Sequence, residues 1–207
     1  MEWNKHPELV NRHTFLSPSK YAFLRKSDEE LVSSYYSSFA TDIGTATHAF
    51  AADCIKLQHT LDEEDWRHLE FELLRKKFPK DSFDIQFIFP TVRQYVNDCI
   101  ARNMDTEVGL MYSNLCGGTA DAIAFRRKKL FIHDLKTGTT PAKIDQLMGY
   151  AALFFLEYGY KPESTHTELR IYQAGEIFVC EPKSDEIREV MGAIVHADLV
   201  LQNLKEE

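Results

Sequence analysis

Residues 117–150 read GGTADAIAFRRKKLFIHDLKTGTTPAKIDQLMGY, and the spacing of apolar runs within this stretch decides the fold. Segments 119–126 and 129–136 have the length and composition of β-strands, and basic residues join them. We therefore expect an antiparallel hairpin. The turn-forming residues 137–141 break the sheet, and segment 143–158 then has the periodicity of an amphipathic helix.

The register of this hairpin predicts which side chains meet. Opposed residues of an antiparallel pair have position numbers with a constant sum. A turn centred on Arg127 and Lys128 makes that sum 255 and places Asp121 opposite Asp134, with Cβ atoms about 4.5–5.5 Å apart. Lys136 shares the face of Asp134 because side chains alternate. Arg-Lys is unfavourable for a tight type I′ turn, so a longer loop with the same centre is the alternative that preserves the register.

Composition describes an ordinary globular protein. The chain has 207 residues, of which 44% are hydrophobic and 27% charged, so we expect one domain spanning 1–207. No apolar run approaches the roughly 20 residues of a membrane span, and the polar N-terminus does not resemble a signal peptide; we expect a cytoplasmic protein that does not contact membranes. The net charge of −8 disfavours tight non-specific DNA binding, although a local basic rim would still permit a nucleic-acid site.

The remaining chain predicts helices before the hairpin and a mixed sheet after it. Helices are expected over 27–39, 43–57, 60–77 (with a Thr60/Glu63 capping box) and 90–102 (with Pro90 at its first position). Strands are expected over 105–115, 165–173 and 176–181, and a last helix from Ser184. The fold class is α/β (α+β), with a mixed central sheet flanked by helices. It divides into a mainly helical N-terminal region over 1–102, a sheet core over 103–183 and a C-terminal helix over 184–207.

The carboxylates of the hairpin suit a hard cation. Asp121 and Asp134 offer the oxygen ligands that Mg²⁺ and Mn²⁺ prefer, and such an ion activates water for attack on a phosphate. Lys136 would orient or help deprotonate that water and balance the charge of the transition state. His48 lies on the small-residue face of helix 43–57 and could approach them closely.

Five motifs in chain order resemble those of the RecB-like branch of the PD-(D/E)XK nucleases, which includes CRISPR-associated exonucleases. They are residues 44–48 (GTATH), Glu107, residues 118–121 (GTAD), residues 134–138 (DLKTG) and residues 146–150 (QLMGY). The resemblance covers about residues 40–180 and implies a restriction-endonuclease-like core. The acid of the triplet is Asp134 where many members have glutamate, and both occur in the superfamily.

The resemblance implies a role for each matching position. His48, Asp121, Asp134 and the backbone carbonyl of Leu135 would bind Mg²⁺ or Mn²⁺. Asp121, Asp134, Lys136, Gln146 and Tyr150 would be catalytic, the last two bracing the site from one helix face. Glu107 either hydrogen-bonds a group beside the site or faces solvent. Some relatives hold an iron–sulfur cluster with three cysteines near the C-terminus; only Cys180 of the four cysteines lies there, so no cluster is expected.

Basic residues outside these motifs are candidates for DNA contacts. Lys20, Arg25 and Lys26 alternate with aromatic residues, a pattern that can contact a nucleic-acid strand. Arg126 and Arg127 occupy the hairpin turn, about 15 Å or more from the carboxylates, where they could touch only a remote phosphate. The alternatives are a packed N-terminal helix and a solvated turn.

Together these features predict a metal-dependent DNA nuclease, most simply an exonuclease that acts on DNA ends in recombination, repair or phage DNA metabolism. A nicking or structure-selective endonuclease with the same site is one alternative. A non-catalytic module that binds DNA or protein is the other. An annealing protein, a helicase or a second copy of the chain are the partners that this class of enzyme suggests.

Overall fold

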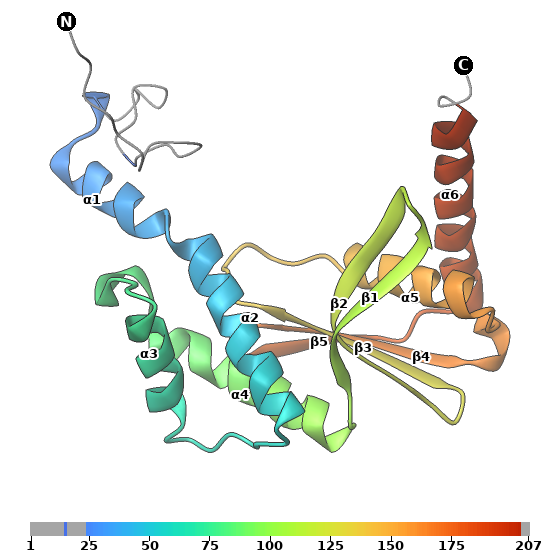
Figure 1. Ribbon diagram of the computed structural model, residues 1–207, viewed down its shortest axis with the longest axis horizontal. Helices are drawn as coiled ribbons and strands as arrows, with labels where there is room; N and C mark the ends of the chain where they lie inside the picture. Colours follow the sequence, from blue (N-terminus) through green and yellow to red (C-terminus); the bar gives the residue numbers. More distant parts are fainter. Residues whose placement is uncertain (1–14, 16–23, 204–207) are drawn as a thin grey trace, which may run out of the picture.

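A five-stranded mixed sheet lies between two groups of helices in the computed structural model, which describes residue 15 and residues 24–203 (Figure 1). The strands follow one another in the order β1-β2-β3-β4-β5. Their bounds are β1 Asp105–Ser113, β2 Cys116–Arg126, β3 Lys129–Lys136, β4 His166–Gln173 and β5 Glu176–Cys180. Only β3 and β4 pair in parallel. The predicted mixed α/β sheet flanked by helices is confirmed.

The β2–β3 hairpin has the predicted register. Every pair from Ala122↔His133 to Arg126↔Lys129 has position numbers that sum to 255. The turn is a tight two-residue one despite its sequence, because Arg127 and Lys128 both adopt left-handed backbone conformations, with φ of 50° and 62°. Two positive φ values match the twist of the strands, so the pairing of two apolar strands outweighs the local cost of placing Arg-Lys there.

The parallel pairing of β3 and β4 requires a crossover, and α5 (Asp145–Tyr158) provides it. α5 ends at Gly159, whose φ of 70° is the left-handed conformation that glycine adopts readily. α5 covers one face of the sheet, and α6 (Ser184–Asn203) packs against α5. Leu147, Ala151 and Phe154 of α5 are buried in that core, as their spacing predicts, whereas Tyr158 is exposed.

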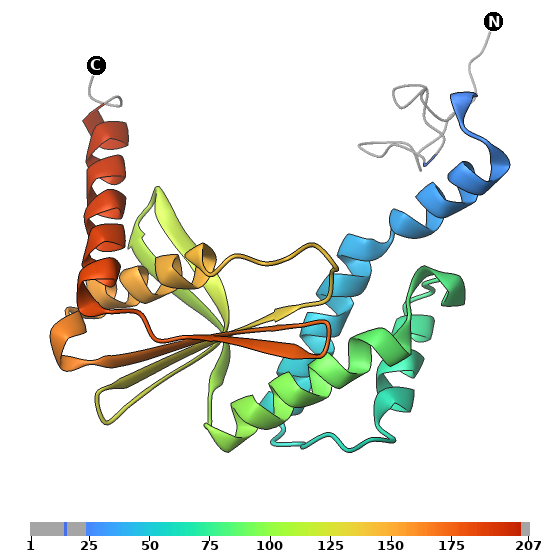
Figure 2. The same ribbon diagram turned by 180° about the vertical axis from the view of Figure 1, so that it is seen from behind.

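The N-terminal helices lie on the other side of the sheet, and the second and fourth of them contact its strands (Figure 2). They are α1 (Asp28–Ser37), α2 (Ala40–Lys56), α3 (Trp66–Arg75) and α4 (Ile85–Ala101). α4 packs on β3 and β4, α2 contacts β1 and α4, and α3 packs on α2 and α4. α1 begins with the predicted capping box, in which Ser27 and Glu30 exchange hydrogen bonds. None of the helices within 24–203 combines the length and apolarity needed to cross a bilayer.

The predicted start of the fourth helix at Pro90 is wrong. α4 begins at Ile85, five residues earlier, and Asp84 caps it by accepting hydrogen bonds from backbone N–H groups of its first turn. Pro90 lies inside the helix, where it cannot donate the usual backbone hydrogen bond. The first turn nevertheless forms because Ile85, Ile88 and Phe89 are buried in the core, which a helix starting at Pro90 would leave unpacked.

The predicted Thr60/Glu63 capping box is also wrong. α3 begins only at Trp66. Asp65 occupies the N-cap position, but its side chain does not bond to the helix. Its Oδ2 instead accepts a hydrogen bond from the preceding Asp62 backbone N–H at 2.8 Å. The segment before α3 is therefore a tight loop held by carboxylates, which compete with the helix for backbone donors.

Candidate functional site

Three carboxylates lie side by side on β1, β2 and β3. The pairing of β1 with β2 has a constant register on both sides of Glu107, which therefore lies opposite Asp121. The backbone pairing of β2 with β3 ends at Ala122↔His133, one position before Asp121 and Asp134, and the same register extended by one residue would place these two opposite each other. The three acidic positions thus form a row across neighbouring strands, and α2 contacts the first of these strands.

α2 brings a histidine to this row. His48 Nδ1 lies 3.4 Å from Asp121 Oδ2. Ligand atoms of His48, Glu107 and Asp121 all lie within 4.8 Å of one another. The helix approaches closely because Gly44, one turn before His48, has no side chain; a Cβ there would lie 3.1 Å from Thr137 Oγ1. The proximity of His48 and Asp121 that the sequence predicts is therefore present in the structure.

Glu107 has a strained backbone. Its φ is 55°, a conformation that glutamate rarely adopts, and it interrupts the backbone pairing between β1 and β2. Strain of this kind costs about 1–2 kcal/mol and persists only where the surroundings impose it. Here it accompanies a carboxylate that reaches the His48 and Asp121 side chains. Glu107 is exposed and also lies beside His48 and Asp121, so the structure does not separate the two sequence-based alternatives.

Asp121 is oriented by the neighbouring strand. Its Oδ2 accepts a hydrogen bond from the Leu135 backbone N–H at 3.0 Å. The same oxygen faces His48, so Leu135 sets the direction of the Asp121 carboxylate. Among the described residues, Leu135 therefore contacts a side chain of the site through its backbone N–H. The family resemblance assigns a different group, the Leu135 carbonyl, as a metal ligand.

Asp134 begins a chain of polar contacts that ends on α5. Lys136 Nζ lies 3.0 Å from Asp134 Oδ1, as a hydrogen bond, and 2.9 Å from Oδ2, as an ion pair without hydrogen-bond geometry. The same ammonium donates to Gln146 Oε1 at 3.0 Å. Gln146 Nε2 in turn donates to the Tyr150 hydroxyl at 3.3 Å. The four residues are therefore one connected group.

Burial and like charge act together on Asp134. The residue is 2% exposed, and burial, followed by the nearby charge of Asp121, raises the pKa of its carboxyl to about 6 against the attraction of Lys136. For His48, burial opposes protonation, but its hydrogen bond to Asp121 and the charges of Asp121 and Asp134 prevail and raise its pKa. The charge of Asp121 contributes to both shifts, although burial is the larger cause for Asp134.

A glycine on β2 makes room for the tyrosine. A Cβ at Gly118 would lie 3.0 Å from Tyr150 Cε1, inside ordinary contact distance. The ring of Tyr150 therefore packs directly against the Gly118 backbone. This contact explains physically why a glycine precedes Asp121 by three residues and why the tyrosine follows Gln146 by one turn.

An open groove of about 640 Å³ gives access to the carboxylates. Its walls come from α2, β1, β2 and the segment after β3, and His48, Glu107, Asp121 and Thr137 line it. Lys56 also lines the groove, although no sequence motif singled it out. Its spacing of eight residues from His48, about two helical turns, is the signal that would have placed it on the same face.

The basic residues predicted to contact DNA lie away from this groove or outside the described residues. Arg126 donates to the Asn103 carbonyl at 2.7 Å, and Arg127 is exposed at the hairpin turn, about 20 Å along β2 from Asp121. Arg25 and Lys26 precede α1 and are exposed, and Lys26 donates to the Ser34 hydroxyl. Lys20 falls outside the described residues.

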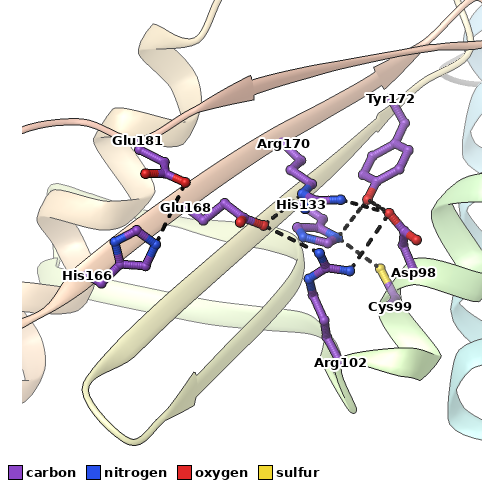
Figure 3. A network of polar contacts seen from close by, with 9 residues as sticks. All are labelled: Asp98, Cys99, Arg102, His133, His166, Glu168, Arg170, Tyr172 and Glu181. Carbon is purple, nitrogen blue, oxygen red and sulfur yellow. Dashed lines mark hydrogen bonds and ion pairs between the residues drawn. The ribbon is translucent and has the colours of Figure 1, made fainter.

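A second polar network lies between α4 and the sheet (Figure 3). Asp98 accepts hydrogen bonds from the Tyr172 hydroxyl at 2.6 Å and from Arg170 Nη1 at 2.9 Å. His133, fully buried, places Nδ1 3.2 Å from the same hydroxyl and 3.6 Å from Cys99 Sγ. Burial lowers the pKa of His133 to about 3, with help from Arg102 and Arg170. These residues fasten α4 to β3 and β4, and no carboxylate of the row takes part.

Comparison with known proteins does not identify the chain. No protein-family model matches it, and no curated protein matches it at a significant level.

Proposed function

We propose that this protein is a metal-dependent nuclease of the RecB-like PD-(D/E)XK type, with a restriction-endonuclease-like core. The observation that carries the proposal is the approach of ligand atoms of His48, Glu107 and Asp121 to within 4.8 Å of one another, beside the buried Asp134 and its half-buried partner Lys136. One helix and three strands supply these groups, from positions as far apart in the chain as His48 and Lys136. Their proximity is therefore a property of the fold rather than of one local motif.

The donor set fits Mg²⁺ or Mn²⁺. Carboxylate oxygens are the ligands that these ions prefer, and imidazole is compatible with Mn²⁺. Asp134 Oδ2 is buried and has no hydrogen-bond partner among the described residues. His48, Glu107, Asp121 and Asp134 would hold the ion, with the Leu135 carbonyl as a further ligand.

Catalysis would divide between the ion and the residues around it. A bound divalent ion supplies Lewis-acid polarisation of a phosphate oxygen and lowers the pKa of water. Lys136 would hydrogen-bond the attacking water and offset the negative charge that develops on the phosphate. Gln146 and Tyr150 hold the Lys136 ammonium at the site through the contacts described above.

DNA ends are the proposed substrate. The motif order is that of RecB-like exonucleases, and an open groove lies beside Glu107 and Asp121. Lys56, at the same groove, supplies a positive charge for a phosphate next to the one that is cleaved. A chain of net charge −8 makes such local cations more important, because the protein as a whole repels DNA.

The test is a nuclease assay on end-labelled linear DNA and on closed circular DNA, with Mg²⁺ or Mn²⁺. We expect metal-dependent shortening of linear substrates that falls by about 100-fold or more in Lys136→Ala and in Asp134→Ala. Lys129→Ala is the matched control, since it removes an exposed lysine from the other end of the same strand. Cleavage of circular DNA would instead establish an endonuclease. An inert protein with both metals, on single and double strands, would refute catalysis and support a binding module.

A further inference from the structure

A second cluster of metal-binding side chains lies where the connection after α2 meets the start of α3. His59 Nε2 lies 4.0 Å from Asp65 Oδ2, and His68 Nδ1 lies 3.1 Å from Asp65 Oδ1. Ligand atoms of the three residues all lie within 4.8 Å of one another. None of them contributes to the carboxylate row, so the nuclease proposal does not account for their arrangement.

Backbone contacts hold this cluster in place. The Asp65 side chain is largely buried, and its Oδ2 is fixed by the Asp62 backbone N–H at 2.8 Å. The backbone N–H of His59 donates to the Cys54 carbonyl at 2.9 Å, which ties the histidine to the last turn of α2. His68 is one turn into α3, on the same side as Asp65. An ordinary helix ion pair explains His68 with Asp65, but it does not require His59 to approach the same carboxylate.

The geometry suits a tetrahedral ion. Ligand atoms about 2.0–2.1 Å from a tetrahedral Zn²⁺ lie about 3.3 Å from each other. Each histidine lies near that distance from one of the two Asp65 oxygens, His68 at 3.1 Å from Oδ1 and His59 at 4.0 Å from Oδ2. Both histidines also line a cavity of about 480 Å³, so solvent can occupy the fourth position.

We propose that His59, Asp65 and His68 form a zinc-class metal site that fastens the 57–65 connection to α3. Two imidazoles and one carboxylate favour Zn²⁺ over Mg²⁺, because nitrogen ligands suit the later transition metals. The carboxylate row favours the opposite choice, since most of its donors are oxygens. The protein therefore carries two sites of different metal preference. Bound zinc would stabilise the corner formed by α2 and α3, and α2 is the helix that carries His48.

Zinc binding is best measured with the carboxylate row disabled. In a His48→Ala/Asp121→Ala background, titration calorimetry with ZnCl₂ should show one ion per chain, and excess MgCl₂ should not displace it. Zinc should also raise the midpoint of thermal unfolding. His59→Ala and His68→Ala should each weaken zinc binding by more than about tenfold. Loss of a residue that only hydrogen-bonds a metal ligand already lowers metal affinity by about 10- to 100-fold.

Controls make the result decisive. His59 and His68 are exposed, so their alanine variants should keep the wild-type circular dichroism spectrum. His196→Ala removes an exposed histidine of α6 and should bind zinc like the background protein. Binding that survives in the His59→Ala/His68→Ala variant would overturn the proposal, as would the absence of binding at about 100 μM Zn²⁺, a concentration that detects even weak sites. Nuclease activity does not enter this test, so the two proposals fail independently.

Discussion

Replacing Asp134 by asparagine should make the metal-free protein more stable at neutral pH. Asp134 is buried beside Asp121, and its carboxyl has a pKa of about 6 in the folded protein. An ordinary aspartate, as in the unfolded chain, has a pKa of 3.8. Asparagine has the shape of the protonated acid and does not ionise. The variant therefore keeps the packing of Asp134 without its charge.

The sign and size of the effect follow from proton linkage. Between pH 3.8 and about 6 the folded protein binds more protons at this carboxyl than the unfolded chain does. Stability therefore falls as the pH rises through that window. At about 1.36 kcal/mol per unit of pKa shift, ionisation of Asp134 lowers the free energy of unfolding by about 3 kcal/mol at pH 7. The attraction of Lys136 is already contained in the shifted pKa.

The assay is urea unfolding followed by circular dichroism in EDTA, at pH 4 and pH 7.5. We expect Asp134→Asn to exceed the wild type by about 2–3 kcal/mol at pH 7.5 and to equal it near pH 4. Asp105→Asn, at an exposed position on β1, is the matched control and should change stability by less than about 0.5 kcal/mol. Added Mg²⁺ or Mn²⁺ should stabilise the wild type more than the variant. A variant that is no more stable than the wild type at pH 7.5 would refute the argument that Asp134 is held in a destabilising environment.

Four other substitutions probe the same region of the sheet and its surroundings. Gly118→Ala should displace the Tyr150 ring, cost about 1–3 kcal/mol in urea unfolding and reduce DNA cleavage; Gly149→Ala, which has open space on α5, should instead stabilise by about 0.5–1 kcal/mol. Glu107→Gly should relieve the positive φ and stabilise the metal-free protein by about 1 kcal/mol, while calorimetry shows weaker Mn²⁺ binding. Folding lowers the pKa of His133 from 6.5 to about 3. Between these two pH values the unfolded chain binds more protons at His133 than the folded protein does. Stability should therefore fall as the pH drops from 6.5, by up to about 1.4 kcal/mol per pH unit, and a pH series of urea unfolding should show a shallower fall in His133→Asn.

The β2–β3 hairpin was predictable because two local signals agree on it. Apolar runs define the strands, and a turn at Arg127 and Lys128 fixes the register, which the observed pairs confirm. From that register alone, Asp121 and Asp134 follow as neighbours. The residue preferences of Arg127 and Lys128 favoured a longer loop. The tight turn forms because strand pairing stabilises it, and single-residue preferences do not include this non-local contribution.

The position of Glu107 was not predictable in the same way. The turn between β1 and β2 is irregular, with a shift of register between Met111 and Ser113. A shift of one residue moves every side chain of a strand to the other face, so Glu107 could not be assigned to the site until the irregularity was seen. The wrong helix start at Pro90 has a related cause. Burial of Ile85 and Ile88 in the core, which only the assembled fold provides, decides where α4 begins.

Three departures from local preference within the strands lie at the carboxylate row. Glu107 has a strained backbone, Asp134 is a buried acid with a raised pKa, and Asp121 lies between them although like charges on adjacent strands repel. Each feature lowers the stability of the metal-free protein. A cation bound among these residues would offset the repulsion and the desolvation, and a carboxylate oxygen of Glu107 lies within 4.8 Å of ligand atoms of His48 and Asp121. Ion pairs alone do not account for the three carboxylates of the row. Among the described residues, the cationic side chains in contact with the row are Lys136 and, when it is protonated, His48. Backbone strain, burial of a carboxylate and repulsion between like charges are costs that do not stabilise the fold. We therefore interpret these residues as a proposed metal site.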